Sequence, residues 1–162
     1  FTDQDEKRLL YELSQMSNKN HLRLTKLALT TGFRRSELLS LTWRNIDLKK
    51  RVIYIYRKNC AATDDSSVLR LVPLPEKAEK ILEESNERNG KVIELSKGAA
   101  RNGFDKARKR AGLQTLRFHD LRHIAISRMW SSGMNALEIS ACSGHRDIKM
   151  LMRYSHYELS LL

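Results

Sequence analysis

Cysteines and long apolar runs are scarce in this sequence, and each scarcity excludes a class of protein. The chain has two cysteines, Cys60 and Cys142, which lie far apart. Such single cysteines fit a reducing cytoplasm and exclude a metal knot built from cysteine alone. No apolar run approaches the ~20 residues that a membrane span needs, and no signal peptide is visible. We therefore expect a cytoplasmic protein that does not use a membrane.

Acidic residues are also in the minority. The 162 residues include 30 Lys and Arg but 19 Asp and Glu, which gives a net charge of +11. Such an excess favours a polyanionic partner, most simply a nucleic acid. An acidic membrane surface is the alternative, but no basic amphipathic helix with exposed aromatic residues supports it. The stretch from Lys97 to Arg128 contains nine basic residues and only two acidic ones. We therefore predict that this region contacts phosphates.

The length and the composition indicate one folded domain. Hydrophobic residues make up 41% and charged residues 30% of the chain, which is typical of a globular protein with a real core. The sequence begins at Phe1 without a Met. We interpret it as a fragment of a longer protein.

Apolar residues at helical spacing dominate the chain. The predicted helices cover about residues 1–17, 21–30, a segment starting near 34, 75–88, 98–111, 119–132, 135–144 and a short segment after 147. Thr2 and Asn135 are predicted N-caps, and Gly32 and Gly144 are predicted helix ends. Asp147 is the predicted cap of the last short helix, which would deliver Tyr154.

The middle of the chain follows a different pattern. Residues 52–56 and 68–72 are rich in β-branched and aromatic or aliphatic residues, with a polar turn between them. They predict an antiparallel sheet of two or three strands, and the short apolar run 92–95 is a further strand candidate. The expected fold is therefore α+β, mostly helical, with a small antiparallel sheet.

Chemically capable side chains gather near the C-terminal end. His119 and Arg122 lie three residues apart, so on a helix they share a face and could grip one phosphate. His145 follows the Gly144 helix end, where a side chain can be aimed into a cleft. Tyr154 carries a phenol, which is a poor nucleophile at neutral pH because its pKa is near ~10. Beside groups that neutralise a phosphate and move protons, this phenol could attack phosphorus.

A metal site is the alternative use of the same segment. His119 and His123 have the i, i+4 spacing of two helical zinc ligands. However, Asp120 stands where a zinc hydrolase places Glu, and Arg122 would put a fixed positive charge beside the cation. We therefore expect no metal.

Three separated motifs resemble the signature of the tyrosine recombinase (phage integrase) family. They are TGFRRSEL at residues 31–38, HDLRH at 119–123, and GH at 144–145 followed by RYSH at 153–156. Together they cover nearly the whole chain in the family's order. The resemblance implies that residues 1–162 are the catalytic domain, with that domain's fold, and that the family's N-terminal core-binding domain is absent from this chain.

The resemblance also implies a role for each matching residue. Arg34 and Arg122 would clamp the scissile phosphate, because guanidinium stays charged and binds bidentately. His119 would act in general acid–base catalysis, and His145 would donate a hydrogen bond to the phosphate. Tyr154 would attack phosphorus and leave a 3′-phosphotyrosine and a 5′-hydroxyl.

Further residues receive supporting roles from the same resemblance. Lys58 would be the general acid for the leaving 5′-oxygen, while Glu37 and His123 would support the site. Ser143 stands where many family members have Leu, and we interpret it as a packing choice. The expected DNA-contacting side chains are Arg35, Lys97, Arg101, Arg108, Lys109 and Arg117.

The implied activity is site-specific DNA recombination or integration without a cofactor. Double-stranded DNA would be the partner, and four protomers would assemble on two DNA sites in the intact protein, whereas this domain alone would be monomeric. The implied protein is bacterial or phage-derived, cytoplasmic and associated with the nucleoid. The alternatives are nicking and closing of DNA like that of a type IB topoisomerase, and a non-catalytic DNA-binding protein derived from a recombinase.

Overall fold

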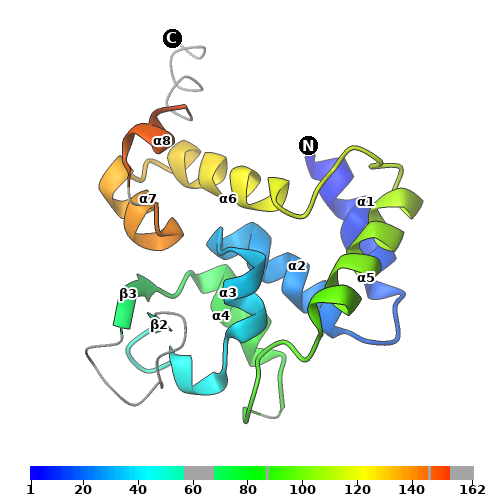
Figure 1. Ribbon diagram of the computed structural model, residues 1–162, viewed down its shortest axis with the longest axis horizontal. Helices are drawn as coiled ribbons and strands as arrows, with labels where there is room; N and C mark the ends of the chain where they lie inside the picture. The colour runs from blue at the N-terminus through cyan, green and yellow to red at the C-terminus, as the bar shows by residue number, and fades with distance from the viewer. Residues whose placement is uncertain (57–67, 87, 146, 154–162) are drawn as a thin grey trace.

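The computed structural model describes residues 1–56, 68–86, 88–145 and 147–153. A small sheet lies at one end of the molecule, and the helices make up the rest of it (Figure 1). The elements are α1 (Asp3–Ser14), α2 (Asn20–Thr31), α3 (Arg35–Ser40), the 3-10 helix η1 (Trp43–Asn45), β1 (Ile46–Asp47), β2 (Val52–Tyr56), β3 (Val68–Pro73), α4 (Glu76–Glu83), α5 (Lys97–Arg110), α6 (Asp120–Ser131), α7 (Ala136–Ser143) and α8 (Lys149–Met152). The predicted mostly helical α+β class is confirmed.

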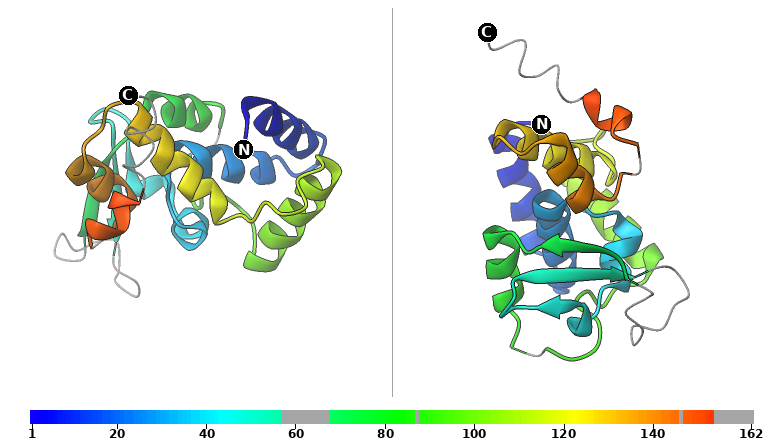
Figure 2. Two further views of the ribbon diagram at one scale, coloured as in Figure 1. Left: turned by 90° about the horizontal axis from the view of Figure 1, so that it is seen from above. Right: turned by 90° about the vertical axis from the view of Figure 1, so that its left-hand side faces the viewer.

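The sheet is antiparallel with the strand order β1-β2-β3. Ile53 pairs with both Ile46 and Val72, which fixes the register of all three strands. Ile53, Ile55 and Val72 are buried, as expected where one face of a sheet packs on a core. Figure 2 (right) shows the three strands side by side, with helices behind them.

Helix α2 lies at the centre of the helical part and contacts α1, α3, α4, α5 and α6 (Figure 1). Its Leu24 and Leu27 are buried together with Leu13 of α1 and Leu121 of α6. This single core places the end of α2 beside the beginning of α6. In the described part of the chain, no helix has the length and apolar character to cross a membrane.

Local sequence signals set several helix ends as predicted. The Thr2 hydroxyl accepts the Asp5 N–H, and Asn135 forms the corresponding capping box with Glu138. Gly144 ends α7 in the left-handed conformation at φ 71°, which glycine adopts without strain.

Two predicted helix ends and one strand candidate are wrong. Helix α1 ends at Ser14 rather than 17, where the Lys19 ammonium caps the Ser14 carbonyl. Helix α4 ends at Glu83 rather than 88, in a tight turn from Leu82 to Ser85. Residues 92–95 form no strand: β pairing is limited to a single antiparallel bridge between Thr42 and Lys91, and beyond it the Glu94 N–H donates to the Asn20 side chain.

We predict that the core contact of α3 is needed for folding. Leu38 is completely buried, whereas Leu137 on α7 is 68% exposed. Leu38→Ala should lower the free energy of unfolding by about 2–5 kcal/mol because it leaves a cavity, and Leu137→Ala should change it by less than about 0.5 kcal/mol. Urea unfolding of both variants measures the difference, and equal losses would contradict this packing.

Candidate active site

One cleft of about 830 Å³ brings together side chains from distant parts of the chain. It lies between the start of α3, β3, the start of α6 and the α7–α8 segment. Its lining residues are Arg34, Arg70, His119, Arg122, His123, Ser140, Ala141, Gly144, His145, Asp147, Met150 and Arg153. Four residues predicted to act on a phosphate, Arg34, His119, Arg122 and His145, are therefore neighbours in space.

Arg122 is the most buried of these groups, with 3% of its surface exposed. Its Nη1 donates to the carbonyl of Gly32, at 2.7 Å. Gly32 ends α2 in the left-handed conformation at φ 65°, and this turn presents the carbonyl to α6. The contact between α2 and α6 thus fixes one side of the guanidinium.

Arg34 occupies the N-cap position of α3. Its backbone N–H donates to Glu37 Oε2 at 2.8 Å, while its Nη1 lies 3.5 Å from Glu37 Oε1. The Arg34 side chain remains 46% exposed. Glu37 therefore fixes the Arg34 backbone while the guanidinium stays accessible from the cleft.

His145 is held by the last turn of α7. Ser140 Oγ donates to the His145 carbonyl at 2.6 Å, and Ser143 Oγ lies 2.7 Å from His145 Nδ1. On the other side, Arg122 Nη2 lies 3.2 Å from Nδ1 and 3.3 Å from Nε2. Ser143 contacts the imidazole directly, so the interpretation of this serine as a packing choice is wrong.

The three histidines of the cleft have lowered pKa values, which favours their neutral form at neutral pH. Burial is the largest cause that lowers the pKa of His145 from 6.5 to about 4, and the charges of Arg122 and Arg34 contribute to the same shift. Burial also lowers the pKa of His119, followed in size by the charge of Arg122. For His123, burial is again the main cause of a lowered pKa, followed by His119. The positive charge of the cleft therefore comes from its arginines.

His119 and His123 meet edge to face, with ring centroids 4.9 Å apart. Within the described residues, no three His, Cys, Asp or Glu side chains come together in a group that could hold a metal ion. The metal-site alternative therefore finds no third ligand in this part of the chain.

Arg70 of β3 is a site residue that the sequence reasoning missed. It forms a bidentate pair with Glu37, at 2.9 Å and 3.2 Å, and the two side chains are only 10% and 15% exposed. Its guanidinium also lies 5.2 Å from the centre of the Phe33 ring. The available signal was a charged residue between apolar ones in a strand, because a buried charge requires a partner.

The Arg70 pair also constrains the turn that carries His145. A Cβ added to Gly144 would lie 2.5 Å from Arg70 Nη1, so the guanidinium occupies the space that a side chain would need. Burial raises the pKa of Glu37, but hydrogen bonds and charge from Arg70 and then Arg34 outweigh it and hold the pKa below its ordinary value. Glu37 is thus an ionised group that joins α3 to β3, and its supporting role in catalysis stays a prediction.

Two of the predicted DNA-contacting arginines adjoin the cleft. Arg35 and Arg117 line a smaller hollow of about 260 Å³ that shares Arg34, His119 and Arg122 with the large cleft. The Arg35 guanidinium lies 5.8 Å from the centre of the Phe118 ring, and Arg117 forms an exposed ion pair with Asp120 at 3.1 Å. The basic surface thus continues beyond the large cleft.

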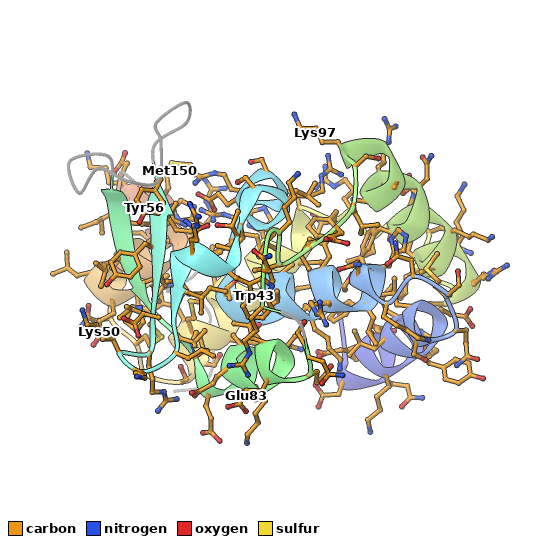
Figure 3. The ribbon with its side chains drawn as sticks, turned by 90° about the horizontal axis from the view of Figure 1, so that it is seen from below. Trp43, Lys50, Tyr56, Glu83, Lys97 and Met150 are labelled. Atoms are coloured by element: carbon orange, nitrogen blue, oxygen red, sulfur yellow. The ribbon has the colours of Figure 1, made fainter. Side chains whose placement is uncertain are left out.

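The other predicted DNA contacts lie on α5. Lys97, Arg101 and Lys109 are exposed, and Figure 3 shows Lys97 and the cleft residue Met150 at the same edge of the molecule, opposite Glu83. Arg108 differs, because it bonds to Asp105 at 2.7 Å and to the Gln114 carbonyl, with 18% of its side chain exposed. This arginine is engaged within the protein.

Two predicted catalytic residues, Lys58 and Tyr154, lie outside the described residues. Their roles stay predictions. Arg153, the residue before Tyr154 in the sequence, lines the cleft.

Comparison with known proteins shows the family of this chain. Residues 1–159 match the phage integrase family. The chain belongs to this family. A curated member, the shufflon-specific DNA recombinase of Escherichia coli, is 37% identical over 132 residues, which are 80% of this chain and 33% of that protein. The chain therefore spans about a third of the length of this relative.

Solved integrase structures share the fold. The catalytic domain of bacteriophage HP1 integrase superposes with a TM-score of 0.75 and 25% identity, covering 97% of this chain and 86% of that one. The Tn1549 transposon integrase, in complex with circular intermediate DNA, gives a TM-score of 0.69 at 20% identity, over 95% of this chain and 61% of that one. The expected tyrosine recombinase catalytic-domain fold is confirmed.

We predict that the Arg70–Glu37 pair is required for stability. Arg70→Met leaves a buried carboxylate without its main partner and should lower the free energy of unfolding by about 3 kcal/mol. Lys26→Met is the matched control, because Lys26 and Glu84 form a more exposed pair at 3.5 Å, which should contribute less than about 1 kcal/mol. Adding Glu37→Gln to Arg70→Met should recover part of the loss. Urea unfolding measures all three variants, and an Arg70→Met loss no larger than that of Lys26→Met would refute the role.

Acidification should destabilise this integrase-family domain. The unfolded chain takes up a proton on His145 near pH 6.5, whereas the folded chain resists until about pH 4. The unfolded state then binds more protons in this window, so stability falls as the pH falls. Urea unfolding at about pH 7 and about pH 5 should show a smaller loss in His145→Gln than in the wild type. An unchanged pH dependence in this variant would contradict the assignment.

Proposed function

We propose that this chain is the catalytic domain of a site-specific DNA recombinase, which cuts and rejoins strands through a phosphotyrosine. The observation that carries the proposal is the convergence of Arg34 and Arg122 with His119 and His145 on one cleft. Two fixed cations suit a group that gains negative charge during reaction, and imidazoles suit proton transfer. Membership of the phage integrase family supports the same activity.

The two arginines would hold the phosphate in complementary ways. Arg122 is anchored through Nη1 on the Gly32 carbonyl, so its position is set before a strand enters. Arg34 is accessible and is tethered to Glu37 mainly through its backbone. Together they would bind the non-bridging oxygens and stabilise the pentacoordinate transition state.

Cleavage would then proceed by in-line displacement. The Tyr154 phenol oxygen forms a bond to phosphorus as the bond from phosphorus to the 5′-oxygen breaks. The phenol proton passes to His119, and Lys58 protonates the leaving 5′-oxygen. The products are a 3′-phosphotyrosine and a 5′-hydroxyl. The covalent link keeps the energy of the phosphodiester, so a 5′-hydroxyl from another strand can reverse the reaction without a nucleotide or a metal ion.

The DNA would run along the basic surface on the cleft side. Arg35 and Arg117 adjoin the cleft, and Lys97, Arg101 and Lys109 extend the surface over α5. Arg108 is left out because its guanidinium is bonded within the protein. The net charge of +11 and the DNA complex of the Tn1549 integrase support double-stranded DNA as the partner.

The intact protein would contain more than this domain. We propose that residues 1–162 supply catalysis while a core-binding domain outside this chain helps to enclose the DNA. Four protomers would join two DNA sites, in association with the nucleoid of a bacterial cell, whereas the domain alone would be monomeric. The length of the curated relative, of which this chain spans about a third, supports a larger protein.

A suicide DNA substrate tests the proposed chemistry. A nick near the crossover site lets the released strand diffuse away, so a covalent protein–DNA adduct accumulates and is visible on a denaturing gel. The wild type should form the adduct, and Tyr154→Phe should abolish it because the phenol oxygen is the nucleophile. Tyr11→Phe is the matched control, since Tyr11 is 63% exposed on α1.

The outcome also separates the remaining functions. No adduct on DNA that the protein binds would favour a non-catalytic DNA-binding protein. An adduct together with relaxation of supercoiled DNA that lacks paired target sites would favour nicking and closing. Adduct formation by Tyr154→Phe would reject the assigned nucleophile.

A further inference from the structure

Ser143 is a completely buried polar residue at the end of α7. Its hydroxyl oxygen lies 2.7 Å from two groups, the carbonyl oxygen of Ile139 and Nδ1 of His145. The left-handed turn at Gly144 folds the chain back so that the imidazole returns to its own helix end. The serine and the histidine, two residues apart, thereby become hydrogen-bond partners.

The direction of these two bonds follows from counting protons. A serine hydroxyl has one proton to donate and lone pairs to accept with, whereas a carbonyl oxygen can only accept. If the hydroxyl proton pointed at His145, the oxygens of Ser143 and Ile139 would face each other at 2.7 Å with no proton between them. The hydroxyl therefore donates to Ile139 and accepts from His145, which requires a proton on Nδ1.

The contacts of Arg122 are compatible with a proton on Nδ1 of His145, but they do not by themselves exclude a proton on Nε2. Arg122 Nη2 is almost equidistant from the two ring nitrogens, at 3.2 Å and 3.3 Å. A guanidinium can only donate, so the ring must offer it a lone pair. With Nδ1 protonated toward Ser143, that lone pair belongs to Nε2.

We infer that Ser143 is a positioning residue that fixes the tautomer of His145, with the proton on Nδ1 and the lone pair on Nε2. The opposite tautomer would set the lone pair of Nδ1 against the Ser143 oxygen at 2.7 Å, with the hydroxyl proton already donated to Ile139. In histidine sites generally, the hydrogen bond made by one ring nitrogen determines the state of the other. Here a residue of the same helix end makes that bond.

The consequence for catalysis rests on the proposed function. A neutral His145 in this tautomer has no Nε2 proton to donate to a phosphate oxygen. Its task in the free enzyme is to accept from Arg122 and so to orient the guanidinium. Donation to the phosphate, the role expected from the sequence, requires a second proton on the ring.

Nitrogen NMR of the protein labelled with ¹⁵N-histidine tests the tautomer without DNA. Above neutral pH, the wild type should show His145 with a protonated Nδ1 and an unprotonated Nε2. His145→Gln identifies the signals by their loss. Ser143→Ala should abolish the preference for Nδ1. Ser140→Ala is the matched control and should retain it, because Ser140 bonds to the His145 carbonyl rather than the ring.

The wild-type spectrum decides the proposal even where a variant does not fold. A proton on Nε2 in the wild type, or an unchanged tautomer in a folded Ser143→Ala, would overturn it. Ser143→Ala should also slow adduct formation by about tenfold, the scale of one lost hydrogen bond. If the wild type shows the expected tautomer but forms no adduct, the proposed recombinase is rejected and the Ser143 assignment stands. If the wild type forms the adduct but carries the proton on Nε2, the Ser143 assignment is rejected and the proposed recombinase stands.

Discussion

The fixed charge of Arg122 is the constraint on which the rest of the site depends. A guanidinium cannot shed its proton inside a protein, so a buried arginine must be surrounded by acceptors. The Gly32 carbonyl and the His145 ring provide two of them. Each comes from a left-handed glycine turn, one ending α2 and the other ending α7. The helix packing that joins α2 to α6 and α6 to α7 therefore also assembles the charged centre.

A second ion pair connects this centre to the sheet. Arg70 reaches from β3 to Glu37, and Glu37 in turn holds the backbone of Arg34. Strand β3 also contacts α7, with the Arg70 guanidinium beneath Gly144. The small sheet is thus part of the support of the cleft. Movement of β3 would disturb both Arg34 and the turn that carries His145.

The sequence was most informative where structure is decided locally. Capping boxes at Thr2 and Asn135 and the glycine ends at Gly32 and Gly144 depend on neighbouring residues, and all are found in the structure. The Arg70–Glu37 pair spans 33 residues, and no local pattern predicts which acid will meet a strand arginine. Ser143 and His145 are only two residues apart in the sequence, but their bond depends on the direction of the Gly144 turn. The direction of this turn is a three-dimensional feature that the order of the residues alone does not give.

The cationic lining of the cleft has a consequence for how a target would be chosen. Guanidinium and imidazole groups recognise the phosphate, and a phosphodiester is identical at every step of a double helix. Arg34, Arg122 and His145 would therefore bind one base step as readily as another. In the proposed recombinase, the sequence of the target would therefore have to be recognised through base edges or the deformability of the duplex, on surfaces other than this cleft.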